Sequence, residues 1–500
     1  MSEPDKKDAA DLLAKLKIEE TSEKKINPLE AKLAEAKKKL EETKKSIPTG
    51  PASSTNAEIK TTSTETKKDE DKKDTKPKDD TNLINSEYEV KVKLADIQAD
   101  PNSPLYSIKS FDELGLTPEL LKGVYAMKFQ KPSKIQERAL PLLLANPPRN
   151  MIAQSQSGTG KTAAFSLTML SRVDLSLGNC CQAICLAPSR ELARQTMEVI
   201  QEMGKFTQIK TQLIVPDSFE KNTNISAHVV VGTPGTVSDL IRRKLLKMDC
   251  IKIFVLDEAD NMIDKQGLGD QCIRVKRFLP KSTQLVLFSA TFSDPVRNYA
   301  KKIVPSANTL ELQRNEVNVK AIKQLYMDCN DENHKYEVLS ELYGLLTIGS
   351  SIIFVQTKDT ANKLYGKLKD DGHQVSILHG DLQTSDRDKL IDDFRQGRSK
   401  VLITTNVLAR GIDIPTVSMV VNYDLPVTGN GQPDPATYVH RIGRTGRFGR
   451  KGVAISFVSD KKSFNVLSSI QKYFDGLEMT RVPTDDWDEV EDIVKKILKE

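Results

Sequence analysis

The sequence predicts an α/β protein made of two tandem domains of mostly parallel sheet, preceded by a charged extension. From about residue 105, short apolar runs alternate with amphipathic stretches, which is typical of βαβ units with helices on both faces of the sheet. This rhythm stops at a polar stretch, 311–318, and then starts again. A chain of 500 residues is also too long to fold around a single hydrophobic core, since domains hold roughly 100–200 residues.

The expected strands are the apolar runs, taken in chain order. In the first domain they are Met151–Ala153, Ala183–Leu186, Val229–Val231, Ile253–Leu256 and Leu285–Phe288. In the second they are Ile352–Val355, Val375–Leu378, Val401–Ile403, Met419–Val421 and Val453–Ile455. We expect an extension over 1–85, a pre-core segment over 86–107, a first domain over 108–307, a linker over 308–320 and a second domain over 321–500.

The extension is rich in Lys, Glu, Asp, Ser and Thr and almost free of aromatic residues, so it buries too little apolar area to offset chain entropy. It is therefore predicted to be disordered and partly helical. Its helically spaced apolar residues suit either transient helix or a partner-binding or self-inhibitory segment; they are Leu12, Leu13, Leu16, Ile18, Leu29, Leu33 and Leu40.

Composition excludes several classes of protein. No run reaches the ~18 apolar residues needed to span a bilayer, and the first thirty residues are too charged for a secretory signal. We therefore expect a soluble, intracellular protein without membrane insertion. The six cysteines form no Cys-x-x-Cys pair, which favours reduced thiols over a disulfide frame or zinc site. A net charge of +5 permits a basic groove without proving one.

A phosphate-binding loop follows the run at 151–153. Backbone N–H groups of such a glycine-rich loop, with a helix N-terminus behind them, hold anionic phosphate. Lys161 would reach the β- and γ-phosphates, and the Thr162 hydroxyl would bind Mg²⁺. The generic pattern has glycine at position 155, where this chain has serine. The alternative is a simple glycine-rich turn. The loop is Ser155, Gln156, Ser157, Gly158, Thr159, Gly160, Lys161 and Thr162.

Two carboxylates follow the buried run Ile253–Leu256 directly. Burying them is costly unless they hold a metal or do chemistry. Asp257 is the expected magnesium partner, through water, and Glu258 is placed to orient or deprotonate the attacking water. Taken alone, Asp257–Asp260 could be only an acidic first turn of a helix. Together with the phosphate loop it predicts nucleotide hydrolysis.

Two further clusters complete the expected ATP site. The Gln136 amide offers a donor and an acceptor that suit the N6/N7 edge of adenine, and Phe129 offers a face for the ring, although ordinary loop packing is equally consistent. In the second domain, Arg444 and Arg447 would reach the γ-phosphate as arginine fingers if the domains close. The alternative is a solvated basic loop. Polar clusters lie outside the carboxyl ends of strands in such sheets, so facing edges predict an interdomain cleft.

These motifs resemble, in order, those of the DEAD-box RNA helicases of superfamily 2, over roughly residues 108–475. The resemblance implies two RecA-like domains that bind ATP, Mg²⁺ and RNA. The matching segments are Phe129–Gln136, Ser155–Thr162, Ala187–Leu192, Thr233–Gly235, Asp257–Asp260, Ser289–Thr291, Ile353–Val355, Thr404, Arg410–Asp413 and His440–Arg447.

The resemblance also implies roles for residues that spacing alone does not assign. The RNA backbone would be held on the first domain by Arg190, Thr233 and Gly235, and on the second by Gly380, Arg387 and Thr404. Such backbone contacts carry no base information. Ser289 and Thr291 would couple the ATP and RNA sites, Asp413 would meet the ribose, and Phe448 could stack on the adenine opposite Phe129.

The chain departs from the family pattern at two positions that border the expected RNA groove. Thr236 stands where the family usually has arginine, and Pro216-Asp217 replaces the usual double-glycine turn. The charged extension, Thr233–Thr236 and Gly431–Tyr438 look like the mRNA-export subfamily of the nuclear pore. That likeness implies a monomer in cytoplasm and nucleus, at the cytoplasmic face of the pore, with a cytoplasmic nucleoporin and an inositol-hexakisphosphate-bound activator as partners. Some members carry an autoinhibitory helix, for which residues 55–90 offer a place.

The expected function is RNA-stimulated ATP hydrolysis that drives local RNA unwinding and ribonucleoprotein remodelling. One alternative is an ATP-locked RNA clamp or scaffold without significant turnover, against which Lys161, Glu258, Arg444 and Arg447 argue. Another is a processive translocase, for which the sequence offers no additional wedge domain.

Overall fold

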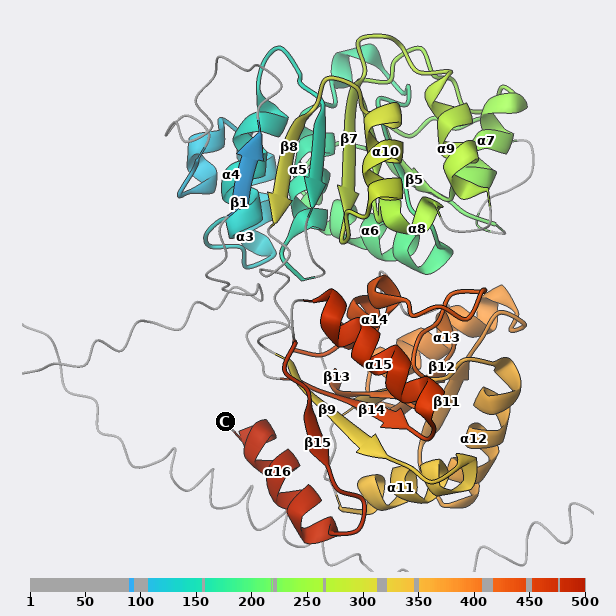
Figure 1. Ribbon diagram of the computed structural model, residues 1–500. Helices are drawn as coiled ribbons and strands as arrows, with labels where there is room; N and C mark the ends of the chain where they lie inside the picture. The colour runs from blue at the N-terminus through green and yellow to red at the C-terminus, as the bar shows by residue number, and fades with distance from the viewer. Residues whose placement is uncertain are drawn as a thin grey trace, which may run out of the picture. The chain divides into compact units, whose positions relative to one another are not determined.

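The computed structural model describes residues 90–93, 107–154, 158–216, 218, 223–263, 267–312, 322–345, 350–406, 417–446, 452–474 and 477–499 (Figure 1). The charged extension over 1–85, with its apolar helical spacing, lies outside these residues. The described chain forms two sheets, each flanked by helices, and we call them the first and second lobes. The predicted class of two tandem RecA-like domains is confirmed.

The first lobe contains an eight-stranded sheet in the order β1-β8-β2-β7-β6-β3-β5-β4. All pairs are parallel except that of β1 with β8. The strands are β1 (Val90–Lys93), β2 (Met151–Gln154), β3 (Ala183–Leu186), β4 (Thr211–Ile214), β5 (Val229–Gly232), β6 (Ile253–Leu256), β7 (Gln284–Ser289) and β8 (Asn308–Leu312). The five runs expected in this domain are all strands.

The edge of this sheet differs from the expected domain boundary. β8 occupies Asn308–Leu312, the start of the segment expected to be a linker, and pairs with β2 from Met151 to Ala153. β1 lies in the expected pre-core segment and pairs with β8, Val90 opposite Leu312. Short polar-apolar edge strands give a weak sequence signal, since their stability comes from pairing rather than from a continuous apolar run. The first sheet therefore extends to Leu312.

Helices cover both faces of the first sheet (Figure 1). Met151 and Ala153 pack into one core with residues of α3 to α6, while Ile152 packs into the other with residues of α7 to α10. This is the period-two alternation of a strand buried on both sides. The helices are α3 (Pro118–Ala126), α4 (Lys134–Leu144), α5 (Lys161–Ser171), α6 (Arg190–Met203), α7 (Pro234–Arg242), α8 (Ala259–Ile263), α9 (Leu268–Lys276) and α10 (Asp294–Ile303), with short 3₁₀ turns η2 (Phe111–Leu114) and η3 (Leu175–Leu177).

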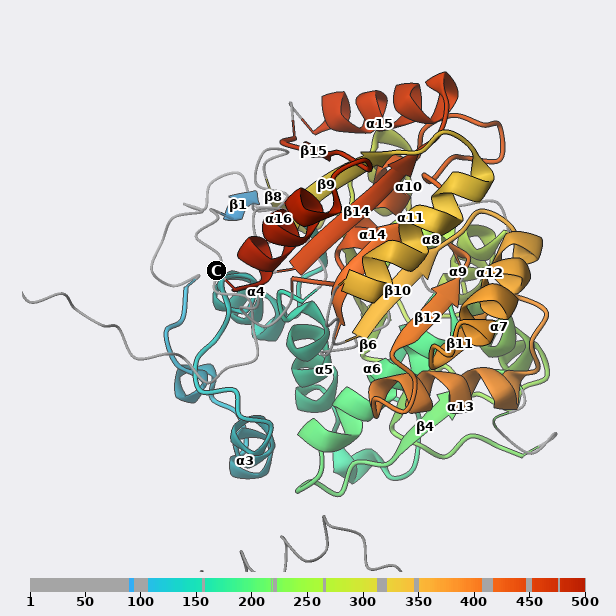
Figure 2. The same cartoon turned by 90° about the horizontal axis from the view of Figure 1, so that it is seen from below.

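The second lobe holds a seven-stranded, wholly parallel sheet in the order β11-β12-β10-β13-β14-β9-β15 (Figure 2). Its strands are β9 (Ile322–Asp328), β10 (Ser350–Phe354), β11 (Val375–Leu378), β12 (Val401–Thr404), β13 (Val417–Asn422), β14 (Gly452–Val458) and β15 (Thr480–Val482). Its helices are α11 (Glu332–Leu345), α12 (Lys358–Asp370), α13 (Thr384–Arg395), α14 (Pro435–Ile442), α15 (Lys461–Tyr473) and α16 (Trp487–Lys499). Every run expected in this domain is a strand.

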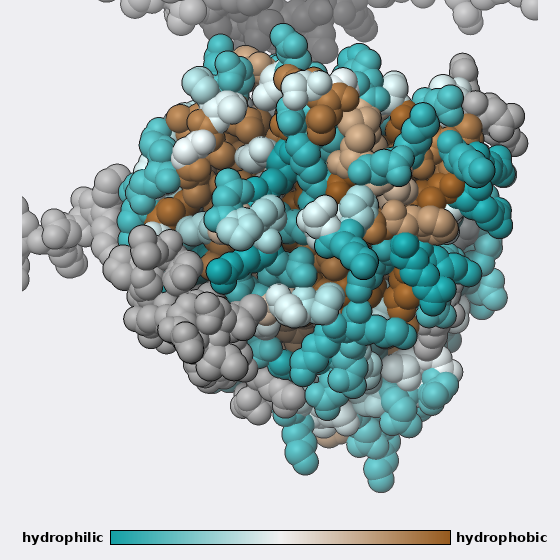
Figure 3. Space-filling model, turned by 90° about the horizontal axis from the view of Figure 1, so that it is seen from above, coloured by the Kyte–Doolittle hydropathy of each residue, from teal (hydrophilic) through white to brown (hydrophobic). Residues whose placement is uncertain are grey.

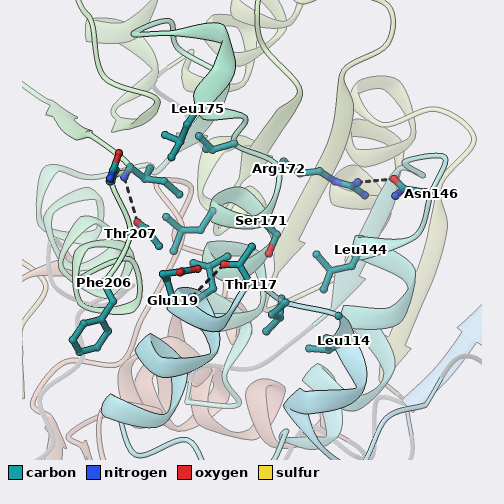
Figure 4. Close-up of a pocket in the computed structure, with 17 residues that line it drawn as sticks. Leu114, Thr117, Glu119, Leu144, Asn146, Ser171, Arg172, Leu175, Phe206 and Thr207 are labelled. Atoms are coloured by element: carbon teal, nitrogen blue, oxygen red, sulfur yellow. Dashed lines mark hydrogen bonds between the residues drawn. The ribbon is translucent and has the colours of Figure 1, made fainter.

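The first lobe also contains a cavity of about 760 Å³ (Figure 4). It is lined by residues from η2 to α3, from the ends of α4 and α5 and the segments that follow them, and from the segment before β4, so it lies at the edge where strands begin. Ligand sites of open α/β sheets lie at the other edge, where strands end.

Figure 3 shows apolar groups in patches between hydrophilic ones on one face of the molecule. Among the described residues, no helix is long and apolar enough to cross a membrane.

Candidate nucleotide and RNA site

The phosphate loop connects β2 to α5, as the motif predicts. Gly158 and Gly160 have left-handed backbones, with φ of 81° and 94°. Gly160 is also the residue before α5, where the helix N-terminus faces the loop. A methyl group there would lie 2.5 Å from Gln136 Nε2, so a side chain would displace the Gln136 amide and also strain the left-handed backbone. Ser155, Gln156 and Ser157 lie outside the described residues, whereas Thr159 is buried and Thr162 is half-buried.

Gln136 ties the phosphate loop to the start of α4. Its Oε1 accepts from Ser133 N at 3.0 Å and its Nε2 donates to Gly160 O at 3.0 Å. Ser133 Oγ donates to Thr159 O at 2.7 Å. The same residues form a capping box at the N-terminus of α4. The amide expected to read adenine thus also positions the phosphate loop, and Phe129 packs partly buried against the first core.

We predict that Gln136→Ala raises the KM for ATP about tenfold, because the phosphate loop loses the Gln136 hydrogen bond to Gly160 O, which contributes about 1–1.5 kcal/mol. Loss of the capping box should also lower the free energy of unfolding by roughly 1 kcal/mol. Steady-state ATPase assays and thermal unfolding would measure both effects. Gln201→Ala, at an exposed position of α6, is the matched control. An unchanged KM would contradict the positioning role.

Lys161, Asp257 and Glu258 form a buried charge cluster at the ends of β6 and the phosphate loop. Lys161 Nζ contacts Glu258 Oε1 and lies 3.9 Å from Asp257 Oδ1. Burial raises the pKa of Asp257 to about 7, since Lys161 only partly offsets it. Burial is the largest single influence on Glu258 and disfavours its ionisation, but the Lys161 and His440 charges and the Lys161 hydrogen bond together lower the pKa of Glu258. Glu258 is therefore the ionised carboxylate at neutral pH.

Two oxygens in this cluster are open to a cation. Asp257 Oδ2 and Glu258 Oε2 are buried and receive no hydrogen bond from the residues that the structure describes. A buried carboxylate oxygen without a partner is costly, and oxygen ligands suit Mg²⁺. The carboxylates therefore fit the expected metal.

Glu258 has a strained backbone, with φ of 52°. A left-handed conformation costs a non-glycine residue about 1–2 kcal/mol. The strain arises where the chain turns sharply from β6 into α8, and Glu258 N donates to Asp257 Oδ1 at 3.0 Å within that turn. Such strain clusters at functional sites, where it presents a side chain in one direction.

Asp260 is the centre of a hydrogen-bond network that sequence reasoning did not assign. Its Oδ2 accepts from Thr291 Oγ1 at 2.7 Å and Thr291 N at 3.2 Å, and its backbone N donates to Ser289 Oγ at 3.2 Å. His440 Nε2, from α14 of the second lobe, lies 3.1 Å from the same Oδ2. The expected coupling residues Ser289 and Thr291 thus meet the acidic box through Asp260. The sequence offered one indication of this network: Asp260 and His440 both lie within segments that match the family, Asp257–Asp260 and His440–Arg447.

We predict that Thr291→Ala removes most of the stimulation of ATP hydrolysis by RNA. The buried Oδ2 of Asp260 would lose its shortest hydrogen bond. The network that holds Ser289, Asp260 and His440 in place would then be destabilised by about 1–3 kcal/mol. The ratio of ATPase rates with and without single-stranded RNA would measure this. Thr291→Ser keeps the hydroxyl and should retain stimulation, so equal loss in both variants would contradict the assignment.

Arg444 is buried just after α14, and its Nε donates to His440 O at 3.0 Å. Its neighbour Arg441 is fully buried and bonds to Asn406, Asn422 and Asp424, which is a packing role. The other expected contacts to ATP from the second domain, Arg447, Asp413 and Phe448, lie outside the described residues.

The residues expected to hold RNA on the first lobe lie after β3 and β5. Arg190 begins α6, and its Nη2 is 2.9 Å from Asp388 Oδ2 of α13. Thr233 precedes α7, and its hydroxyl lies 3.0 Å from that of Thr236. A methyl group at Gly235 would lie 3.1 Å from Gln271 Oε1.

Two residues that depart from the family pattern hydrogen-bond to residues expected to hold RNA. Thr236 pairs with the Thr233 hydroxyl, and Pro216 O accepts from Arg190 Nη1. Asp217 lies outside the described residues.

On the second lobe the three expected RNA residues lie near the ends of β11 and β12. Arg387 donates to Gly380 O and lies 3.7 Å from Glu191 Oε1 of α6. Thr404 is buried at the end of β12, and its hydroxyl donates to Leu378 O at 2.9 Å. Gly380 and Arg387 thus contact each other, whereas the Thr404 hydroxyl is directed into its own lobe.

Comparison with known proteins shows which family this chain belongs to. The DEAD/DEAH box helicase model matches residues 133–299, and the helicase conserved C-terminal domain model matches 334–449. The chain is 74% identical over 501 residues to the ATP-dependent RNA helicase DBP5 of Candida glabrata, covering 99% of each chain.

Two solved structures are also similar. One is S. cerevisiae Dbp5 bound to RNA and ADP BeF3, with 82% identity, a TM-score of 0.76 and coverage of 78% of this chain and 100% of that one. Another is a variant of S. cerevisiae Dbp5 bound to Nup159, a Gle1 variant, IP6 and ADP, with 78% identity, a TM-score of 0.59 and coverage of 77% and 100%. With the charge cluster at Lys161 and the Asp260 network on two helicase lobes, the chain belongs to the DEAD-box family of ATP-dependent RNA helicases.

Proposed function

We propose that this protein is an RNA-stimulated ATPase that unwinds RNA locally and remodels ribonucleoprotein particles during mRNA export at the nuclear pore. The single observation that carries the ATPase part is the Asp260 network, in which the acidic box contacts Thr291 of its own lobe and His440 of the other. RNA and ATP contacts on both lobes would converge on these residues.

In the proposed reaction, Lys161 exchanges its internal carboxylate partner for the β- and γ-phosphates of ATP. Glu258 then orients and deprotonates the attacking water, and Arg444 and Arg447 stabilise the charge that develops on the γ-phosphate. Thr162 and Asp257 would hold Mg²⁺, which neutralises phosphate charge when it is bound. Gln136, Phe129, Asp413 and Phe448 would bind the nucleoside.

For RNA we propose backbone contacts from Arg190, Thr233 and Gly235 on the first lobe and Gly380, Arg387 and Thr404 on the second. Contacts of this kind give affinity without sequence preference. ATPase assays with and without single-stranded RNA test this proposal directly. Strong stimulation is expected, whereas ATP-dependent RNA retention without turnover would indicate a clamp. Unwinding yield that falls steeply with duplex length separates local strand displacement from processive translocation.

The export role rests on similarity to Dbp5, whose solved complexes contain Nup159, Gle1 and IP6. We propose equivalent partners here, a cytoplasmic nucleoporin and an inositol-hexakisphosphate-bound activator, and residence at the cytoplasmic face of the pore. Binding of the purified full chain to the cytoplasmic nucleoporin, measured by calorimetry, tests this part. Absence of binding under conditions where RNA-stimulated hydrolysis is normal would refute the pore assignment and leave the ATPase assignment intact.

A further inference from the structure

Two cysteines lie level with each other where neighbouring strands of the first sheet begin. β3 and β6 pair in parallel, with Ala183 opposite Ile253 and Leu186 opposite Leu256. Just before these strands, Lys252 N still donates to Gln182 O at 2.7 Å, so the backbones have not yet separated. Cys180 and Cys250 each stand three residues before the first paired residue of their strand. The register therefore brings them side by side.

The Cys250 thiol lies close enough to Cys180 to raise the pKa of Cys180, and both side chains are partly exposed. Cys180 and Cys250 are half-buried, whereas Cys181, Cys185, Cys272 and Cys329 are buried. Burial, and then a hydrogen bond with the Cys250 thiol, raise the pKa of Cys180 to about 11. Cys180 Sγ also lies 3.6 Å from Leu177 O, at the end of η3. The neighbouring Cys181 differs because its Sγ is directed to Ala183 O at 3.7 Å, inside the lobe.

We propose that Cys180 and Cys250 are an oxidative modification site, at which a peroxide converts two thiols into one intramolecular disulfide. Adjacent strands lie about 4.8 Å apart, and disulfides join Cα atoms about 4.4–6.8 Å apart, so the bond needs little backbone movement. Four of the six cysteines are excluded from this role by burial.

The chemistry is a two-electron oxidation with the peroxide as oxidant. The thiolate of one cysteine attacks a peroxide oxygen, forming an S–O bond as the O–O bond breaks and hydroxide leaves. The second thiol then attacks the sulfenic sulfur, forming the S–S bond as the S–O bond breaks. The two thiol protons end in water, so one hydrogen peroxide yields two waters and one disulfide.

The raised thiol pKa determines the pH dependence. A pKa of about 11 leaves little Cys180 thiolate at neutral pH, and the thiolate fraction rises about tenfold per pH unit below that value. Attack on the peroxide by Cys180 is therefore slow at pH 7 and accelerates as pH rises.

The disulfide would close a loop of residues 181–249, which contains Arg190, Thr233 and Gly235. Closing a long loop restricts the unfolded chain, so the midpoint of thermal unfolding should rise on the order of 5–10 °C. The phosphate loop lies at the opposite edge of the sheet and is not enclosed.

The test uses the purified, reduced full chain treated with hydrogen peroxide at pH 7, 8 and 9. Tryptic peptides separated without reduction are expected to contain a cross-link from Cys250 to the peptide that holds Cys180, Cys181 and Cys185, lighter by two hydrogen atoms than the free pair. Cys180→Ser and Cys250→Ser should abolish it, and Cys181→Ser should retain it. Thermal unfolding of the reduced variants verifies their fold.

Several results would overturn the proposal. These are a cross-link that persists in Cys180→Ser, intermolecular dimers in place of the internal bond, or oxidation to sulfinic acid without any cross-link. A yield that falls as pH rises from 7 to 9 would also contradict the assigned chemistry.

Discussion

Replacing Glu258 by glutamine is expected to lower the RNA-stimulated kcat for ATP hydrolysis by roughly 10²–10⁴-fold, the usual contribution of a general base. Glutamine keeps the size of the side chain but cannot accept a proton from water. Although burial opposes ionisation, the Lys161 charge lowers the pKa of Glu258, so the wild-type carboxylate is ready to act as a base at neutral pH. The change therefore removes the base and leaves the shape of the site.

Binding of ATP should persist in Glu258→Gln, because Lys161 and the phosphate loop still contact the phosphates. Fluorescence titration with a labelled nucleotide would measure the Kd, and phosphate release would measure kcat. Glu202→Gln, on an exposed part of α6, is the matched control and should hydrolyse ATP normally. Near-normal RNA-stimulated turnover by Glu258→Gln would falsify the assignment.

Replacing Lys161 by alanine is expected to weaken ATP binding about 10- to 100-fold, since hydrogen bonds to charged groups contribute about 1.5–3 kcal/mol. It should also destabilise the nucleotide-free first lobe. Lys161 is the cation that contacts the buried Glu258 and lies 3.9 Å from Asp257. Removing one partner of a buried ion pair costs roughly 3–5 kcal/mol, because a charge is left unpaired in a medium of low polarity.

Chemical denaturation in the absence of nucleotide would measure this second effect. Lys161→Met, which retains most of the side-chain volume, separates lost charge from lost packing and should be destabilised nearly as much. Lys205→Ala, at an exposed residue just after α6, should leave both ATP affinity and stability unchanged. Full stability of Lys161→Met would show that the internal ion pairs contribute little.

Much of the fold could be predicted because parallel strands buried on both faces are continuous apolar runs. Ala183–Leu186 and Ile253–Leu256 were expected with the bounds that β3 and β6 have. The expectation failed at β8 and omitted β1, β4, β9 and β15, which lie at or near sheet edges, where polar residues alternate with apolar ones. Pairing with a neighbour distant in sequence stabilises those strands, and local sequence does not contain that information.

The candidate site was predicted in the same uneven way. The phosphate loop and Asp257–Glu258 are contiguous in sequence, so their chemistry could be inferred from residue types and spacing. The dual contacts of Gln136 and the network at Asp260 could not, because they join residues separated by 24, 31 and 180 positions.

The sequence by itself determined the class of fold, the order of the motifs and the residues able to bind phosphate and activate water. Only the tertiary structure decided which carboxylate Lys161 contacts, where strain is placed, and that Asp260 joins Thr291 to His440. The physical reason is that ionisation, hydrogen bonding and the proximity of Cys180 to Cys250 depend on distances between strand ends. Those distances are set by strand pairing and by the packing of helices and loops, which arise only when distant segments come together.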